Sequence, residues 1–312
     1  MIVRSLVAVL AITFAAGSVQ AVHLNGMDVS VYQKKIDWKT VQAAGIKFAF
    51  TKATEGNAFV DSRFKENMAG AASVGILIGP YHFARPDNDR ENPQDAANEA
   101  NHFVDTIESY YNGPSLVMRP VIDVEKLPGF DKPAKNKAFL SQWIRKFAAT
   151  VNKRLGFNPI IYANSNYAKN YFEKDVSQYD LWLANWTLDA DKPPAKSQYG
   201  IWDKWYFWQY TSHGAVEGIG GRVDRDVFAG TMLELAQFVP NFHPGDYDGN
   251  GRVDDRDREV WRKTKGQTVN PGTGADGDLS GTVDDADLAV WKANNGKTYT
   301  IGSHRSPIRH GS

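Results

Sequence analysis

Residues 120–125, PVIDVE, place two carboxylates in a run that otherwise has the composition of a buried strand. Asp123 and Glu125 are two residues apart, so on a strand both side chains point to the same face, about 6.6–6.8 Å apart along the chain. Two carboxylates flanking a bond suit glycoside hydrolysis, in which one protonates the leaving oxygen and the other handles charge at the anomeric carbon. Like charges in a partly buried cleft also raise the pKa of one of them. A strand end whose acids face solvent or pair with lysine is the structural alternative.

A second set of oxygen-bearing residues forms two repeats, DYDGNGRVDDRD (246–257) and DGDLSGTVDDAD (276–287). Each repeat has oxygen ligands at positions 1, 3, 5 and 9, a backbone carbonyl at position 7, glycine at position 6 and an acid at position 12, which is the pattern of a calcium loop. The repeats therefore predict two structural Ca²⁺ ions, with no cofactor for catalysis. The predicted ligands are Asp246, Asp248, Asn250, Arg252, Asp254 and Asp257 in the first loop, and Asp276, Asp278, Ser280, Thr282, Asp284 and Asp287 in the second.

The elements that must position the first acids alternate between short strands and amphipathic helices. The predicted strands are residues 47–53, 76–83, 119–125, 159–164, 181–186 and 206–211, and the predicted helices are 62–73, 93–110 and 135–155. This alternation predicts a parallel α/β barrel, in which working residues lie at the carboxyl ends of the strands. Polar residues recur at those ends: Glu55, His82, Asp123, Glu125, Asn164, Asn185 and Gln209.

The chain divides into five predicted segments. Residues 1–21 read as a secretory signal peptide, 22–239 as the barrel domain, 240–245 as a linker, 246–297 as the duplicated calcium-loop domain and 298–312 as a polar tail. The sequence thus predicts an exported protein of the bacterial envelope or exterior, with no membrane span in the mature chain. Zero formal charge without basic blocks argues against nucleic acid as a partner, and the absence of cysteine excludes thiol catalysis.

The order of motifs in residues 24–239 closely resembles glycoside hydrolase family 25, the Chalaropsis-type lysozymes. The motifs are NGMDVSVYQKKIDW (25–38), KFAFTKATEG (47–56), GPYHFARP (79–86), PVIDVE (120–125), YFWQYTS (206–212) and GRVDRDVF (221–228). This resemblance implies an irregular (β/α) barrel and cleavage of the β-1,4 bond between N-acetylmuramic acid and N-acetylglucosamine in peptidoglycan. It further implies that Glu125 is the general acid, that Asp123 stabilises the anomeric centre, and that Asp28 and Asp224 line the cleft.

Two positions depart from this family pattern. Asp226 stands where the family usually has asparagine, and it can alter nearby pKa values or form a salt bridge with Arg225 or Arg222. Lys34 stands where glycine is frequent, so that loop is expected to have a different shape.

Four aromatic residues near strand ends are candidates for stacking on sugar rings. They equally suit a role as lids of the core. These residues are Tyr81, Tyr162, Trp186 and Tyr210.

The repeated loops, each followed by a single helix, resemble a small all-α type I dockerin module. This resemblance implies a cohesin-like protein partner. At positions 10 and 11 of the loops, where such modules often carry Ser-Thr, the sequence has Asp255–Arg256 and Asp285–Ala286, so a different partner is also open.

Three alternatives to a muramidase remain at this stage. A family 18-type chitinase or endoglucosaminidase would have a further aspartate at the position of Val121. A catalytically silent glycan-binding or scaffold protein would bind cell walls without releasing reducing ends. In a calcium-binding interaction protein, the large domain would be only a spacer.

Overall fold

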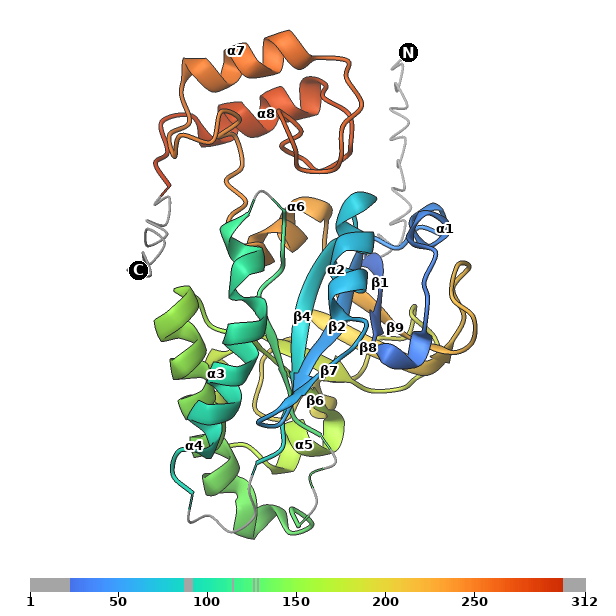
Figure 1. Ribbon diagram of the computed structural model, residues 1–312, viewed down its shortest axis with the longest axis vertical. Coiled ribbons are helices and arrows are strands. Elements are labelled where there is room, and N and C mark those ends of the chain that lie inside the picture. Colours follow the sequence, from blue (N-terminus) through green and yellow to red (C-terminus); the bar gives the residue numbers. More distant parts are fainter. Residues whose placement is uncertain (1–22, 87–91, 114, 126, 128, 300–312) are drawn as a thin grey trace, which may run out of the picture.

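The computed structural model describes residues 23–86, 92–113, 115–125, 127 and 129–299 (Figure 1). The predicted signal peptide and most of the predicted polar tail lie outside the described residues. No helix in the described ranges combines the length and apolar character needed to cross a membrane.

Eight strands close into a barrel, as the alternation in the sequence predicts. Around the barrel the order is β1-β9-β8-β7-β6-β5-β4-β2, and β2 pairs with β1 to complete the circle. All neighbours are parallel except β9, which is antiparallel to both β1 and β8. The strands are β1 (His23–Val29), β2 (Phe48–Glu55), β4 (Leu77–Phe83), β5 (Val121–Asp123), β6 (Ile160–Asn164), β7 (Leu181–Ala184), β8 (Phe207–Gly214) and β9 (Val223–Ala229), and the short β3 (Phe59–Val60) forms a hairpin with β2.

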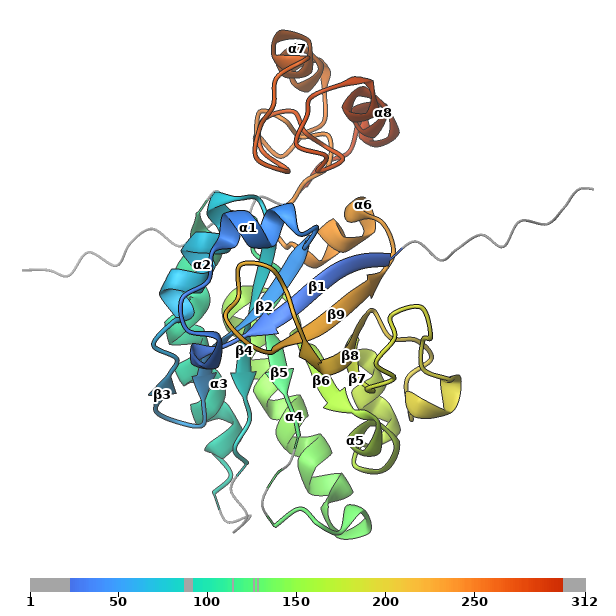
Figure 2. The same ribbon diagram turned by 90° about the vertical axis from the view of Figure 1, so that its right-hand side faces the viewer.

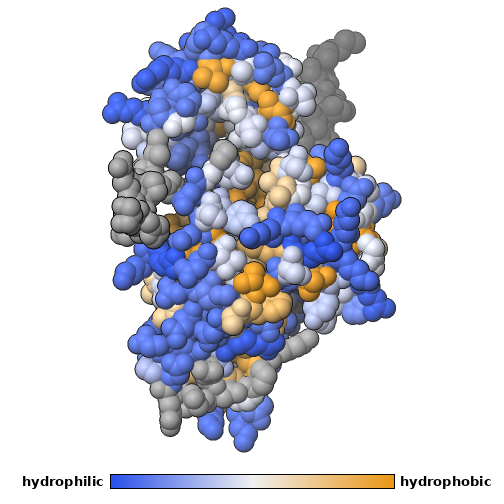
Figure 3. Space-filling view, in the orientation of Figure 1, coloured by the Kyte–Doolittle hydropathy of each residue, from blue (hydrophilic) through white to orange (hydrophobic). Residues whose placement is uncertain are grey.

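The helices cover the outside of the barrel over the parallel strands (Figures 1 and 2). The longest, α4 (Pro133–Leu155), begins with proline in its first turn, where the missing N–H costs nothing, and ends at Gly156 with φ 87°, a left-handed conformation that favours glycine. The others on the barrel are α1 (Trp38–Ala43), α2 (Phe64–Ser73), α3 (Asp95–Ile107), α5 (Ser165–Asn170) and α6 (Met232–Leu235), with 3-10 turns at Val31–Gln33, Glu108–Asn112, Lys174–Gln178, Lys196–Gln198 and Ala236–Phe238. The face shown in Figure 3 is largely hydrophilic, with hydrophobic residues in small groups.

Strand alternation sorts the core into two layers, and this explains the acids in PVIDVE. Ile122 and Val124 belong to the outer cluster between strands and helices, whereas Val121 belongs to the inner cluster inside the barrel. Asp123 shares the inward side of the chain with Val121, because side chains two apart on a strand point the same way. The inward side of β5 therefore begins with the apolar Val121 inside the barrel and ends with Asp123 at the barrel mouth, which is why a buried strand carries an acid.

Two predicted strands end earlier than expected. β5 stops at Asp123, so Glu125 lies two residues beyond the strand, and β7 stops at Ala184, so Trp186 lies in the following loop. Val124 still donates its N–H to the Tyr162 carbonyl (3.0 Å), which guides the chain at the end of β5.

The C-terminal repeats form two helices that lie beyond the end of the barrel where the parallel strands begin (Figures 1 and 2), and loop residues of the repeats contact that end. The two helices are α7 (Asp255–Thr264) and α8 (Asp285–Asn294). Leu279 is buried in the same apolar cluster as the barrel interior, and Gly272 lies against Leu116, just before β5. The strands' carboxyl ends, at the opposite end of the barrel, are left uncovered by these helices.

Candidate active site

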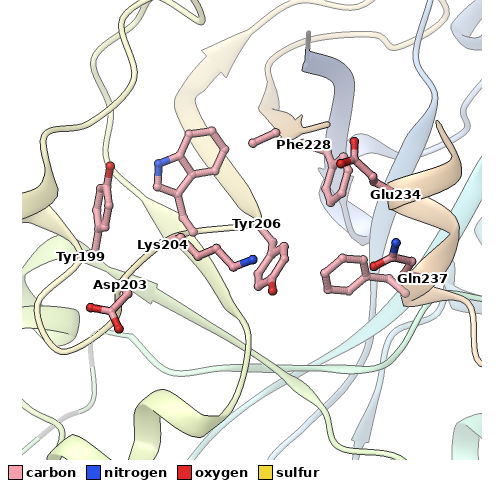
Figure 4. A pocket seen from close by; sticks show the side chains of 10 residues that line it. Tyr199, Asp203, Lys204, Tyr206, Phe228, Glu234 and Gln237 are labelled. Carbon is pink, nitrogen blue, oxygen red and sulfur yellow. The ribbon is translucent and has the colours of Figure 1, made fainter. Parts of the chain in front are cut away.

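The volumes of the cavities do not identify the site. Three cavities among the described residues measure about 430, 440 and 440 Å³. The one in Figure 4 lies at the amino-terminal end of β8, where Tyr199, Tyr206 and Lys204 line it, and none of the four predicted catalytic acids reaches it. All four acids line another cavity instead, hereafter called the acid cavity: Asp28, Asp123, Glu125 and Asp224.

Different strands bring these acids together at one mouth of the barrel. Asp28 on β1 pairs directly with Asp224 on β9, and Asp123 ends β5. Glu125 is half-buried just beyond β5, whereas Asp123 is 7% exposed. The structure thus places the four predicted acids in a single cavity. The rest of the lining consists of Val29, Ser30, Tyr32, Gln33, Lys52, Tyr81, Phe83, Tyr162, Trp182, Trp186, Gln209, Ser212 and His213.

Burial and mutual repulsion favour the protonated forms of the deep acids. Burial raises the pKa of Asp28 well above its usual range, and the charges of Asp224 and Asp226 raise it further. Burial also raises the pKa of Asp123, with a further contribution from Glu125. The site therefore tends to hold protons at a pH where exposed aspartates have lost theirs.

One hydrogen-bond donor and two nearby cations act in the opposite direction. Gln209 donates from Nε2 to Asp28 Oδ2 (2.7 Å), which favours the ionised form of Asp28. Lys52 and Arg85 lower the pKa of Asp123 by their positive charges. Charge in the cavity is consequently set by a balance between burial and a few fixed partners.

Asp226 is a fifth acid of this group, and it lies beneath the cavity rather than in its lining. It is fully buried, its Oδ1 accepts a hydrogen bond from Trp182 Nε1 (2.8 Å), and no N–H group of the described residues reaches its Oδ2. Burial raises its pKa well above the usual range. Its carboxyl is close enough to that of Asp28 for a hydrogen bond, which forms only when one of the two carries a proton. Of the two roles open to Asp226 from the sequence, the structure favours the effect on neighbouring pKa values over a salt bridge.

Three of the four predicted aromatic residues line the acid cavity. Tyr162 is buried, and its hydroxyl donates to Gln209 Oε1 (3.0 Å). Trp186 donates from Nε1 to the same oxygen (2.9 Å), but its ring is 50% exposed at the rim. Tyr81 lines the wall. Tyr210 does not contribute to the lining, because it alternates with the inward-facing Gln209 and packs against Trp208 on the other face of β8.

The other polar residues at strand ends have structural partners. His82 faces outward between Thr54 (2.8 Å) and Glu99 (2.7 Å), and burial lowers its pKa, so it stays neutral. Asn164 accepts from the Tyr167 N–H and caps α5. Asn185 donates to Ser165 Oγ (2.9 Å).

The sequence reading missed several lining residues. Tyr32 is 84% exposed at the cavity rim, and Trp182 forms part of its floor. Lys52 lies three residues before Glu55, the last residue of β2. A sequence signal did exist for Lys52, since it is the single charged residue in residues 48–54.

In the C-terminal repeats, carboxylates converge as a hard cation requires. One oxygen from each of Asp246, Asp248 and Asp257 lies within 4.8 Å of the others, and Asp276, Asp278 and Asp287 repeat this arrangement. Such oxygen sets are what Ca²⁺ prefers.

The aspartates at position 9 of the two calcium loops also cap the helices that follow. Asp254 and Asp284 cap α7 and α8 by accepting backbone N–H groups at 2.8 and 2.7 Å. A ligand at this position often acts through water, so capping and calcium binding are compatible.

Tryptophans join the two loops reciprocally. Trp261 of the first repeat donates from Nε1 to the Asp284 carbonyl (2.6 Å), and Trp291 of the second donates to the Asp254 carbonyl (2.9 Å). Each loop is thereby held by a side chain from the other repeat.

Comparisons with known proteins match the barrel. A family model described as glycosyl hydrolases family 25 matches residues 27–219. Over 222 residues the chain is 31% identical to lysozyme M1 of Streptomyces globisporus, covering 70% of this chain and 72% of that protein. It is also 32% identical over 213 residues to an autolytic lysozyme of Clostridium acetobutylicum, covering 67% and 57%. The structure is similar to that of the bacterial lysozyme from Streptomyces coelicolor, with a TM-score of 0.56 at 27% identity, covering 69% of this chain and 96% of that one.

Proposed function

The chain belongs to glycosyl hydrolase family 25, and we propose on this basis that it is a secreted enzyme cleaving the β-1,4 bond between N-acetylmuramic acid and N-acetylglucosamine in peptidoglycan. The observation that carries the proposal is the convergence of Asp28, Asp123, Glu125 and Asp224 on one cavity. The chain is a glycoside hydrolase of this family, and its relatives are cell-wall lytic lysozymes.

Glu125 is the general acid in this proposal. Its side chain is half-buried at the cavity mouth, so it can reach both solvent, which returns its proton, and the glycosidic oxygen of a bound chain. Retaining and inverting glycosidases both use a carboxylic acid that protonates the leaving group.

Asp123 stabilises the positive charge that develops at the anomeric carbon, or the oxazolinium ion formed by the substrate's own acetamide. It is more deeply buried than Glu125, so its charge acts in a region of low dielectric, where stabilisation of a nearby cation is strong. The two carboxylates repel one another, which favours a state in which one of the two carries a proton.

Asp28 and Asp224 complete the negative lining opposite this pair. Gln209 orients Asp28 through its amide N–H and is itself held by the hydroxyl of Tyr162 and the indole of Trp186. This network fixes the amide orientation, because Gln209 Oε1 receives two donors and Nε2 is left to donate. The exposed ring of Trp186 at the rim offers a face for a sugar ring.

We further propose that the C-terminal repeats bind two Ca²⁺ ions and form a dockerin-like module with a protein partner, cohesin-like or other. The ions would be held by the converging aspartates, with Asn250 and Ser280 at position 5 and the carbonyls of Arg252 and Thr282 at position 7. Bound calcium would supply folding free energy to a small segment with few buried apolar residues. The module lies away from the acid cavity, so its partner would leave the cleft accessible.

Hydrolysis of purified peptidoglycan by wild type and Glu125→Gln tests the catalytic proposal. The variant keeps the shape of the side chain but has no proton to give, so the rate should fall by about 10²–10⁴-fold. Glu66→Gln is a matched control, because Glu66 is an exposed residue of α2 paired with Arg63. Wall binding by wild type without release of reducing ends would favour the silent glycan-binding alternative.

A further inference from the structure

A second cavity of about 440 Å³ opens beside the acid cavity and shares Tyr32 and Lys52 with it. We call it the side cavity; the residues used below are Tyr32, Lys52, Glu55, Phe59, Asp61 and Arg85. The shared residues make the two cavities adjoining parts of one depression. A substrate bound at the acids can therefore extend a branch into the side cavity.

The side cavity holds two cations, Lys52 and Arg85, against two carboxylates, whereas four carboxylates line the acid cavity. Lys52 and Arg85 both bind the Glu55 carboxylate, Arg85 at 2.7 Å. Burial raises the pKa of Glu55, but its hydrogen bonds and charge interactions with these two cations bring it below the usual value. Asp61 balances the second cation, so the side cavity is neutral overall. The two cations nevertheless carry more N–H donors than the Glu55 carboxylate can accept, because Asp61 accepts backbone N–H groups instead.

Aromatic rings hold the two cations in place. The Lys52 ammonium lies 4.9 Å from the Phe83 ring centroid and 5.3 Å from that of Phe59. The Arg85 guanidinium lies 4.5 Å from Phe83. These contacts restrict both side chains to the cavity wall. Less side-chain entropy is therefore lost when the cations bind an anionic group of a ligand.

The wall of the side cavity is also fixed to the wall of the acid cavity. Asp61, after the β2–β3 hairpin, accepts the backbone N–H of Val31 (2.9 Å) and that of Arg63 (2.8 Å). Val31 directly precedes Tyr32, whose ring is exposed to both cavities. The hairpin and the loop after β1 therefore form one supported rim, rather than two independent surface loops.

Surface stability alone does not account for this arrangement. The Arg85 side chain is 42% exposed and that of Glu55 is 25% exposed, and ion pairs of this kind contribute little to folding free energy. Complementary charge next to a catalytic cleft acts instead on recognition of a charged substrate.

We propose, on the premise that the proposed muramidase function is correct, that the side cavity binds the peptide stem of peptidoglycan through a stem carboxylate held by Lys52 and Arg85. Muramic acid carries a lactyl group on the ring whose bond is cleaved, and the stem is attached to that group. The stem thus leaves the glycan close to the acids, which repel its carboxylates, and the adjoining cations attract them. Phe59, 47% exposed, offers apolar contact for a stem side chain.

The test compares two substrates: glycan fragments whose stems keep their carboxylates, and the same fragments with those stem carboxylates converted to amides. Wild type should have a kcat/KM about tenfold higher for the fragments with stem carboxylates, as expected for one charge-assisted hydrogen bond. Arg85→Gln should bring the ratio of the two kcat/KM values close to one. Glu55→Gln removes the competing carboxylate and should raise the ratio above that of wild type, an effect that misfolding cannot produce. Lys204→Gln, in the cavity of Figure 4, is the matched control and should keep the wild-type ratio.

Three outcomes would overturn the proposal. Equal ratios in wild type and Arg85→Gln, with rates unchanged, would show that the side cavity does not bind the stem. Equal ratios with an equal loss on both substrates would show that Arg85 acts through its charge on Asp123 and not on the stem. If wild type hydrolyses neither substrate, the muramidase function itself is refuted, and the inference fails with it.

Discussion

Replacing Asp226 by asparagine should make the stability of the barrel less dependent on pH. Asp226 and Asp28 are buried close together, and burial raises the pKa of both carboxyls above the value near 3.9 that aspartate has in an unfolded chain. Above that pH the folded state binds more protons than the unfolded state. The free energy of unfolding therefore falls as pH rises, until the pH passes the raised pKa.

The size of this effect follows from proton linkage. One extra proton in the folded state lowers the free energy of unfolding by about 1.4 kcal/mol per pH unit. Asparagine cannot ionise, so the Asp226→Asn variant loses the contribution of Asp226 and the repulsion that Asp226 adds at Asp28, while burial and Asp224 still act on Asp28. For a domain of about 150–250 residues, 1 kcal/mol corresponds to about 2–4 °C in Tm, so the Tm of the variant should gain about 3–6 °C on wild type per pH unit.

Thermal unfolding between pH 5 and pH 7, in saturating calcium, measures this difference. Asp203→Asn is the control, because the Asp203 side chain is 93% exposed and its variant should follow wild type at every pH. If the Tm curves of wild type and Asp226→Asn run parallel, Asp226 and Asp28 do not hold an extra proton, and the account of charge in the cavity is wrong.

Three further predictions concern packing and calcium. Gly26→Ala would place a Cβ 2.2 Å from the buried ring of Phe48, so it should lower the free energy of unfolding by about 1–3 kcal/mol; an unchanged denaturation midpoint would contradict the rigid inner core. Trp261→Phe removes the hydrogen bond to the Asp284 carbonyl and should weaken calcium binding in the second loop about 2- to 12-fold by calorimetry. Trp291→Phe should weaken the first loop instead, and effects confined to the mutated repeat would refute the reciprocal contact. Chelation of calcium should unfold the C-terminal helices but leave hydrolysis of soluble glycan fragments unchanged, and a loss of that activity would place calcium in catalysis.

The barrel and the acid cavity could both be predicted from the sequence, for the same physical reason. Apolar β-branched runs marked the strands, and carboxyl ends of parallel strands meet at one mouth. Asp123 and Glu125 could therefore be placed at the mouth from strand ends alone, whereas Asp28 and Asp224 were placed there by the resemblance to family 25. The strand boundaries were less predictable, because the end of β5 depends on hydrogen bonds between distant strands, such as that from Val124 to Tyr162.

Asp226 and Tyr210 show what local sequence leaves out. Asp226 has arginine beside it, which left both a local salt bridge and an effect on nearby pKa values open, but the register of β9 against β1 and β8 turns its side chain inward to Trp182. That register depends on contacts between distant strands, so the local sequence does not show it. For Tyr210 the signal was present, since alternation with Gln209 already places the two on opposite faces of β8.

The most direct measurement of the central claim is mass analysis of fragments released from purified peptidoglycan by wild type and Glu125→Gln. The account predicts fragments with reducing-end N-acetylmuramic acid from wild type, and release by the variant that is about 10²–10⁴-fold slower. Fragments with reducing-end N-acetylglucosamine, or equal rates for the two proteins, would contradict it.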